Sequence, residues 1–155
     1  MSDTPASRHP ARRCPAGWLP LILLALLTLS APAGAGGQAE FGDLRVHYSA
    51  VPTASLSDAI ARQYGIPRSR LSALVLVSVL RDGTAIAADV RGQTRDRRDR
   101  TESLRFRELD AGGYVSYVAL ARIESGEALT FDLSIRAEGT DQRHSLQFRE
   151  NFVVD

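Results

Sequence analysis

Hydrophobic and polar residues alternate along most of the chain after residue 40, which is the pattern of β-strands with one buried face. The segment 129–135 is the clearest case, because every second residue in it is a large apolar one. Short segments rich in glycine and aspartate separate the alternating stretches and predict turns. The pattern predicts strands at residues 41–51, 71–80, 84–94, 104–109, 114–123, 129–135 and 146–152.

The segment 71–80 is almost wholly apolar, so its periodicity alone does not distinguish a buried strand from a buried helix. Its valine content and the turn-forming Asp-Gly pair that follows it favour a strand. We expect residues 84–94 to return beside it as the second strand of a hairpin. Ile86, Ala88 and Val90 would then face inward.

A short helix is expected between the first two strands. Ser55-Leu56-Ser57-Asp58 resembles a capping box, in which a hydroxyl and a carboxylate three residues later satisfy free backbone N–H groups. Gly65 can adopt the left-handed conformation that ends a helix, and Pro67 prevents continuation. The helix is therefore predicted from about Leu56 to Tyr64.

Seven strands with closely spaced turns predict an all-β fold. The expected architecture is an antiparallel seven-stranded sandwich of immunoglobulin-like size, with one short helix between the first two strands. A small open barrel is the main alternative. The Cys…Trp…Cys pattern of immunoglobulin domains is missing, so the expectation concerns architecture and not membership of that family.

Residues 1–39 differ from the rest of the chain and predict a cleaved signal peptide. A basic start is followed by an apolar run from Trp18 to Ala31 and then by small residues, which are the three parts of a secretory signal. The run is shorter than the roughly 20 residues of a membrane-spanning helix, so a retained anchor is the less favoured alternative. Cleavage could follow Ala33, Ala35 or Ala39.

Ala39 is the preferred cleavage position, because strand-like sequence begins at Phe41. Residues 40–155 would then form one domain, a length sufficient for a single well-buried core. The leucine-rich signal favours the general secretory route and a periplasmic or secreted location. After cleavage, no stable membrane span is expected.

Removal of the signal changes the chemistry available to the chain. The only cysteine, Cys14, and the only tryptophan, Trp18, are both in the signal. The mature domain would therefore have no disulfide, no thiolate metal site and no cysteine nucleophile. The whole-chain formal charge of +1 includes three arginines and one acid before residue 40, so residues 40–155 carry −1. A near-neutral domain argues against nucleic-acid binding.

Several short stretches follow one another through the mature region, at residues 41–43, 46–48, 61, 64–66, 68–69, 106–108, 117–119, 129, 131–132 and 152–155. In their order and spacing they resemble domain-of-unknown-function family 4426, a family of short secreted bacterial proteins. The resemblance covers essentially the whole mature chain and implies an exported single-domain envelope protein, with no established activity and no functional residues to carry over.

Neither a metal or cofactor site nor a catalytic site is expected. A metal needs three or more ligands in one shell, and the mature region has only two histidines, His47 and His144. There is no Gly-x-Ser-x-Gly motif and no phosphate-binding glycine loop. The alternative function is a small periplasmic hydrolase or anion-binding enzyme that uses one of these histidines.

The sharpest local feature is basic. Between residues 91 and 107 there are seven arginines and three acids, and the planar guanidinium group suits phosphate or carboxylate. Arg97, Arg98 and Arg100 are the candidate anion-binding residues. The competing interpretations are a solvated loop whose charges pair weakly with one another and association with a membrane surface.

The sequence thus favours a non-enzymatic envelope domain that binds a partner protein or envelope component through a sheet edge or a loop. Tyr64, Tyr114 and Tyr117 are candidates for a ligand groove, although aromatics at strand ends more often pack at the core or its rim. The pattern leaves open the ligand, the partner, the strand order and the oligomeric state.

Overall fold

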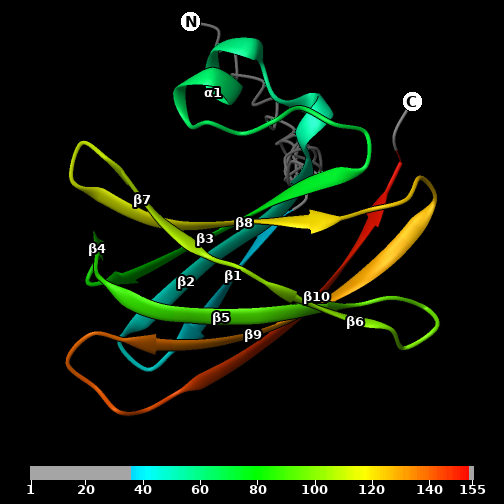
Figure 1. Cartoon of the computed structure of the whole chain (residues 1–155). Helices are drawn as coiled ribbons and strands as arrows, with labels where there is room; N and C mark the ends of the chain where they lie inside the picture. Colours follow the sequence, from blue (N-terminus) through cyan, green and yellow to red (C-terminus); the bar gives the residue numbers. More distant parts are fainter. Residues whose placement is uncertain (1–35, 154–155) are drawn as a thin grey trace, which may run out of the picture. The chain divides into compact units, whose positions relative to one another are not determined.

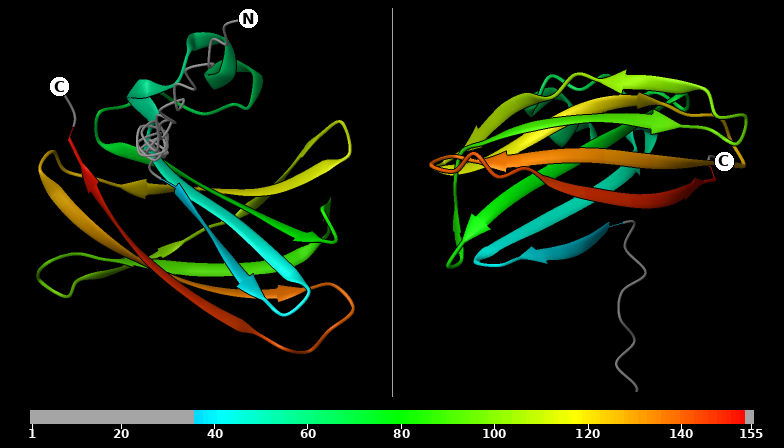
Figure 2. Two further views of the ribbon diagram at one scale, coloured as in Figure 1. Left: turned by 180° about the vertical axis from the view of Figure 1, so that it is seen from behind. Right: turned by 90° about the horizontal axis from the view of Figure 1, so that it is seen from below.

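The structure, a computed structural model, describes residues 36–153. Two antiparallel sheets face each other (Figures 1 and 2). Sheet A has the order β1 (Gly36–Phe41), β2 (Leu44–Pro52), β3 (Ser72–Arg81), β8 (Tyr114–Arg122) and β7 (Arg107–Ala111), with β4 (Thr84–Ala85) beside β3. Sheet B has the order β10 (His144–Phe152), β9 (Glu127–Ala137), β5 (Ala88–Arg95) and β6 (Thr101–Leu104).

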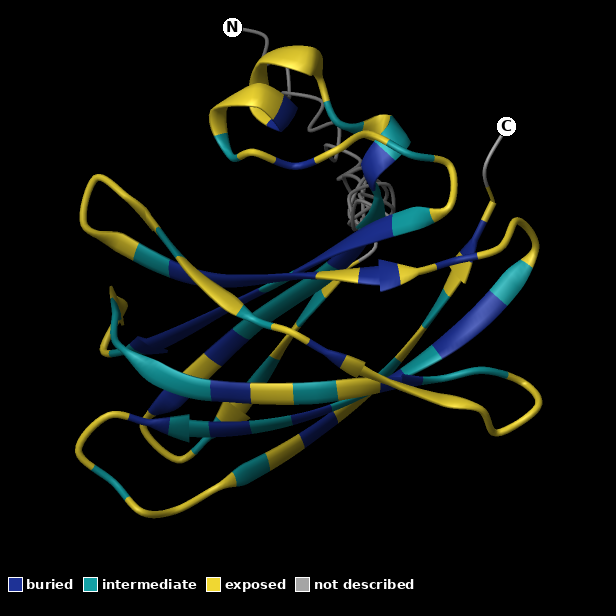
Figure 3. Ribbon diagram, in the orientation of Figure 1, coloured by how far each residue is buried: buried dark blue, intermediate teal, exposed yellow. Residues whose placement is uncertain are grey.

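The main core lies between the sheets and follows the alternation seen in the sequence. Every second residue of β9 from Leu129 to Ile135 is buried in it. β3 contributes its odd-numbered residues from Ala73 to Val79 to the same core. β3 is buried along nearly all its length (Figure 3), because its other face is also covered.

The outer face of sheet A carries a second, smaller cluster in which Ile66 packs with Leu74 and Val118. Ile66 belongs to the segment between β2 and β3, which includes the 3-10 turn η1 (Thr53–Ser55) and the helix α1 (Asp58–Gln63). This segment therefore covers part of the outer face of sheet A (Figure 1).

The expected helix exists but begins later than predicted. Ser57, not Ser55, is its N-cap, and the Ser57 hydroxyl accepts a hydrogen bond from the Ile60 N–H at 3.3 Å. Residues 53–55 form the separate 3-10 turn, so Leu56 is extended. Gly65 has the predicted positive φ, at 62°.

The predicted hairpin of 71–80 with 84–94 is wrong beyond its turn. β4 pairs with β3 over only two residues, and β5 lies in sheet B between β9 and β6. The reason is that β8 occupies the same side of β3, with Val77 opposite Tyr117. After Ala85 the chain cannot continue along β3, and it crosses to the other sheet.

The single strand predicted at 104–109 is also divided. β6, in sheet B, ends at Leu104, and β7, in sheet A, begins at Arg107. Arg105 and Phe106 therefore cross between the sheets. Phe106 lies against Gly92 of β5, where an added Cβ would come within 3.3 Å of its ring.

The all-β sandwich is confirmed, and it consists of two separate sheets. The described residues form ten strands instead of seven, because two predicted strands are divided by crossings and β1 precedes the first prediction. β1 and β2 are joined by the two-residue turn Gly42-Asp43, with Gly42 at a φ of 63°. No helix among the described residues is long and apolar enough to cross a membrane.

Candidate functional site

The three arginines predicted to bind anions lie on the loop that joins β5 to β6. Asp96 organises this loop, since its carboxylate accepts hydrogen bonds from the backbone N–H groups of Arg98 and Arg100. It also pairs with the Arg100 guanidinium at 2.5 Å, whereas Arg97 donates to the Gly126 carbonyl at 3.5 Å. The guanidinium groups of Arg97 and Arg100 thus have different partners within the protein.

The pKa of Asp96 reflects this arrangement. Burial of the carboxyl group would raise its pKa, but the hydrogen bonds from Arg100 and Arg98 outweigh burial and lower it. The hydrogen bond to Asp96 and the negative charge of Asp96 raise the pKa of Arg100. Within the loop, therefore, Asp96 already compensates the charge of Arg100 and leaves less of it for an external anion.

The other arginines of the basic stretch divide into two groups. Arg91 and Arg95 form ion pairs with Asp89 and Asp132. Arg105 and Arg107 form no ion pair with any described residue. The Arg107 guanidinium instead donates to the Tyr64 carbonyl at 2.6 Å. These last two arginines lie at the crossing between β6 and β7.

The crossing leaves part of β8 without a strand neighbour. β7 pairs with β8 from Tyr114 to Val118 only, while β3 pairs with β8 up to Arg122. Residues 119–122 therefore have a hydrogen-bonded strand on the β3 side and no hydrogen-bonded strand on the other. Ile123 donates to Leu71 on the β3 side, and backbone groups alternate in direction along a strand. The N–H and C=O groups of Leu120 and Arg122 consequently point to the open side.

A hollow of about 650 Å³ lies at this open edge and is here named the β8 groove. Its apolar wall is formed by sheet A and the segment after α1, and its polar wall by the crossing from β6 to β7. Leu120, which lines it, is 45% exposed and supplies apolar surface at the open edge. The lining residues are Gly65, Ile66, Leu74, Glu102, Ser103, Arg105, Arg107, Val118, Ala119 and Leu120.

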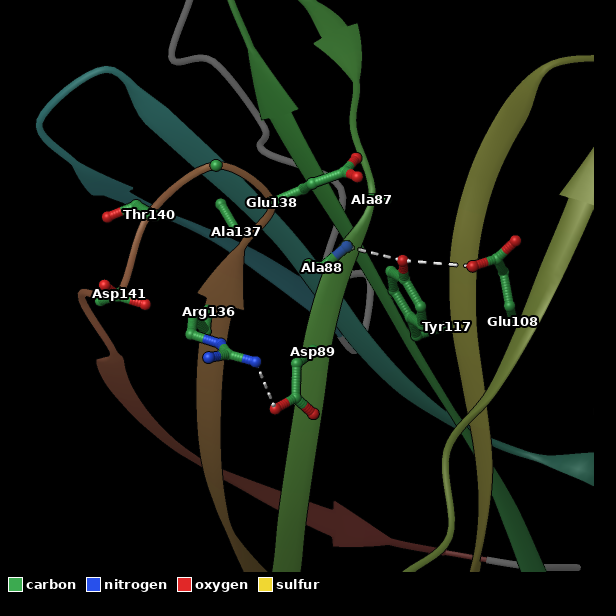
Figure 4. A pocket seen from close by; sticks show the side chains of 11 residues that line it. Ala87, Ala88, Asp89, Glu108, Tyr117, Arg136, Ala137, Glu138, Thr140 and Asp141 are labelled. Carbon is green, nitrogen blue, oxygen red and sulfur yellow. Dashed lines mark hydrogen bonds and ion pairs between the residues drawn. The ribbon is translucent and has the colours of Figure 1, made fainter.

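A second hollow, of about 500 Å³, lies between Tyr117 of β8 and the start of β5 (Figure 4). Tyr117 lines it, and its hydroxyl accepts a hydrogen bond from the Ala88 N–H at 2.7 Å while donating to Glu108 at 3.5 Å. Burial raises the pKa of the Tyr117 phenol, and the negative charge of Glu108 adds to the effect. The phenol is thus neutral and ties β8 to the start of β5.

The rim of this second hollow is acidic, with Asp89, Glu108, Glu138 and Asp141 against Arg136. Hydrogen bonds from Arg143, at 2.7 Å, and from Arg91 lower the pKa of Asp89. Asp89 also lies 3.7 Å from Arg136, so arginines of the protein itself neutralise its negative charge. Three carboxylates remain at the rim: Glu108 on β7, and Glu138 and Asp141 on the connection from β9 to β10.

The candidate histidines and tyrosines are dispersed. The His144 ring stacks on Phe41 at 4.7 Å between centroids, while His47 lies on β2. Tyr64 packs against the cluster on the outer face of sheet A, and Tyr114 is 45% exposed. Among residues 36–153 there is no group of three or more His, Cys, Asp or Glu side chains that could hold a metal ion.

Comparison with known proteins identifies the family of the chain. The model of the family described as "Domain of unknown function (DUF4426)" matches residues 38–155. The chain belongs to the DUF4426 family. A crystal structure of a DUF4426 protein from Pseudomonas aeruginosa PAO1 is similar to it, with 26% identity and a TM-score of 0.69, covering 78% of this chain and 97% of the other. None of the curated protein sequences compared with the chain matches it.

The DUF4426 fold is also found in FetP. A copper-bound FetP variant from uropathogenic Escherichia coli strain F11 has 9% identity and a TM-score of 0.58, covering 77% of this chain and 95% of FetP. A second FetP structure, from protein expressed in the periplasm of E. coli, has 8% identity and a TM-score of 0.56, covering 77% and 94%. At these identities the likeness shows the fold alone.

Proposed function

We propose that this DUF4426 protein is an exported, non-enzymatic domain of the bacterial envelope that binds another envelope protein through the open edge of β8. The observation that carries the proposal is the pairing of β8, whose residues 119–122 have a strand neighbour on one side only. Unpaired N–H and C=O groups at a sheet edge are a template for strand addition. The exposed Leu120 side chain supplies apolar surface beside them.

Three further observations agree with the proposal. The signal-like residues 1–39 support export. Membership of the DUF4426 family, described above as a family of short secreted bacterial proteins, also supports it. Neither the β8 groove nor the hollow at Tyr117 is lined by a histidine, a cysteine or a metal-binding cluster. Binding needs none of these groups, whereas hydrolysis that depends on a histidine, a cysteine or a metal ion needs at least one of them.

Site-specific photo-crosslinking in the native host tests the binding. A photoreactive residue replaces Ser103, which lines the groove, or Ser145, which is exposed on β10 of sheet B. We expect a discrete crosslinked species from position 103 in the periplasmic fraction and none from position 145. Identical patterns from both positions, or no species from either, would contradict the proposal.

The non-enzymatic part has its own test. A deletion strain is complemented with the full chain carrying both His47→Ala and His144→Ala. We expect the double variant to restore the deletion phenotype as fully as the unmodified chain, because neither histidine lines the groove. Loss of complementation by a variant that still folds and accumulates would favour an enzyme that uses histidine.

A further inference from the structure

The β8 groove has a charge as well as a shape. Arg105 is exposed and forms no hydrogen bond or ion pair with another described residue. Arg107 donates one hydrogen bond to the Tyr64 carbonyl and has no carboxylate partner in the described part of the chain. Glu102 is the only acidic side chain among the lining residues. The groove is therefore net positive on a domain whose overall formal charge is slightly negative.

Arg107 and Arg122 lie on the outer face of sheet A, beside the open edge of β8. Arg107 is opposite Val118, and Val118 faces the outer cluster of sheet A. Because side chains alternate along a strand, Leu120 and Arg122 project from β8 on this same outer face. An added strand would therefore place every second side chain among Arg107, Leu120 and Arg122. Its other side chains would face the apolar interior beside Leu104 and Ala119.

We propose that the β8 groove binds an extended protein segment in which apolar residues alternate with acidic ones. The segment adds to sheet A as a strand along β8 residues 119–122, and its carboxylates pair with Arg105 and Arg107. This inference rests on the proposed function and specifies the chemistry of the partner. Main-chain hydrogen bonds supply affinity in such complexes, and the alternate side chains supply selectivity.

The direct test uses two synthetic peptides and the protein purified after expression of the full-length chain. In one capped heptapeptide valine alternates with glutamate, and in the other lysine replaces glutamate. Titrations are followed by backbone amide NMR and by hydrogen exchange. We expect only the acidic peptide to shift the groove resonances and to slow exchange of the Leu120 and Arg122 amides.

Two sets of variants separate strand pairing from charge. Leu120→Pro removes an N–H on the open side and leaves the β3-facing groups of Ala119 and Ala121 in place. It should abolish binding while the thermal unfolding transition stays cooperative. Arg105→Gln with Arg107→Gln should weaken binding of the acidic peptide at least fivefold. The matched control, Arg97→Gln with Arg98→Gln, should change it less than twofold.

Several outcomes would overturn the inference. These are equal binding of the lysine peptide, no binding of either peptide, shifts that map outside the groove, or a larger effect from the control pair than from Arg105 and Arg107. If the crosslink from position 103 is nevertheless found, the proposed function stands and only the partner chemistry is wrong. If the acidic peptide binds but no crosslink forms in cells, the proposed function fails separately.

Discussion

Tyr117 connects the two sheets through one hydroxyl group. It lies on β8 of sheet A, and its oxygen accepts the N–H of Ala88 at the start of β5 in sheet B. The phenol therefore holds the chain at the point where it crosses from one sheet to the other. Its side chain is almost fully buried.

Tyr117→Phe should lower the free energy of unfolding by about 1 kcal/mol, because the Ala88 N–H loses its acceptor at a site that water can still reach. The matched control is Tyr114→Phe, which alters an exposed ring on the same strand and should change stability by less than about 0.5 kcal/mol. Urea unfolding measures both. Equal effects of the two substitutions would show that the Tyr117 hydroxyl does not hold the crossing.

The Asp89 carboxylate forms ion pairs with three arginines: Arg91 on β5, Arg136 on β9 and Arg143 in the turn before β10. Hydrogen bonds from Arg143 and Arg91 lower its pKa in the folded state. The folded protein thus binds fewer protons at this group than the unfolded chain. The stabilisation is complete above the unfolded pKa near 3.8 and disappears as the pH falls through the lower folded value.

Asp89→Asn should therefore destabilise the protein at pH 7, and the difference from the unmodified chain should shrink steadily between pH 4 and pH 2. Urea midpoints at pH 7, 5, 3 and 2 measure it. Asp141→Asn, at an exposed carboxylate on the same rim, is the control and should change stability at pH 7 by less than about 0.5 kcal/mol. A constant Asp89→Asn effect over the whole range would mean that the carboxylate charge contributes nothing.

At the scale of elements, β1 changes the expected position of signal cleavage. It begins at Gly36, and Ala39 pairs with Val46 and packs against the core. The Tyr48 ring occupies the space over Gly37, where an added Cβ would lie 2.4 Å from its hydroxyl oxygen. Cleavage after Ala39 would remove most of this strand.

We therefore expect processing after Ala33 or Ala35, so that the mature chain starts at Gly34 or Gly36. Intact-mass measurement and N-terminal sequencing of the exported protein determine the position. A mature chain starting at Glu40 would show that β1 is dispensable. In that case an edge of β2 would be open in the native protein.

The elements that the sequence predicts well are those whose pattern is local. The alternation at 129–135 locates β9 because each of its residues has one fixed face. The pairing of 84–94 is not predictable in the same way, since it depends on β8, which follows some thirty residues later. The groove lies in a different part of the basic stretch from the predicted anion-binding residues. The density of arginine favours Arg97, Arg98 and Arg100, whereas the groove forms at Arg105 and Arg107. Those two lie beside an open edge because the β7–β8 hairpin ends at Arg107 opposite Val118, where the chain has just crossed from sheet B. The hydrophobic pattern does not mark that crossing.

At the scale of the whole molecule, β3 is the most protected element. β2 pairs with it from Ala73 to Arg81, and β8 and β4 occupy parts of its other side. Both of its faces are buried. β6, in contrast, is a short strand at the edge of sheet B with mostly exposed residues.

Hydrogen exchange should follow this difference. We expect β3 amides such as Val75 and Val77 to exchange only through global unfolding, with rates that rise with urea as steeply as the unfolding equilibrium. The β6 amides should exchange faster and respond little to urea, because they open locally. Equal protection of β3 and β6 would show that the two sheets have no such gradient of stability.

The chain enters sheet A and leaves sheet B at the same end of the sandwich (Figure 2). Gly36 pairs with Ser49, which in turn pairs with Leu76. Phe152 pairs with Glu127, the first residue of β9, which follows the end of β8 in the chain. The open residues of β8 are at this end too, whereas the turns Gly42-Asp43 and Gly112-Gly113 are at the opposite one. A tether, tag or fused domain joined at Gly36 or Phe152 would thus start at the same end of the sandwich as the open residues of β8, but at the opposite edge of each sheet. A label placed in the Gly112-Gly113 turn would leave the groove unobstructed.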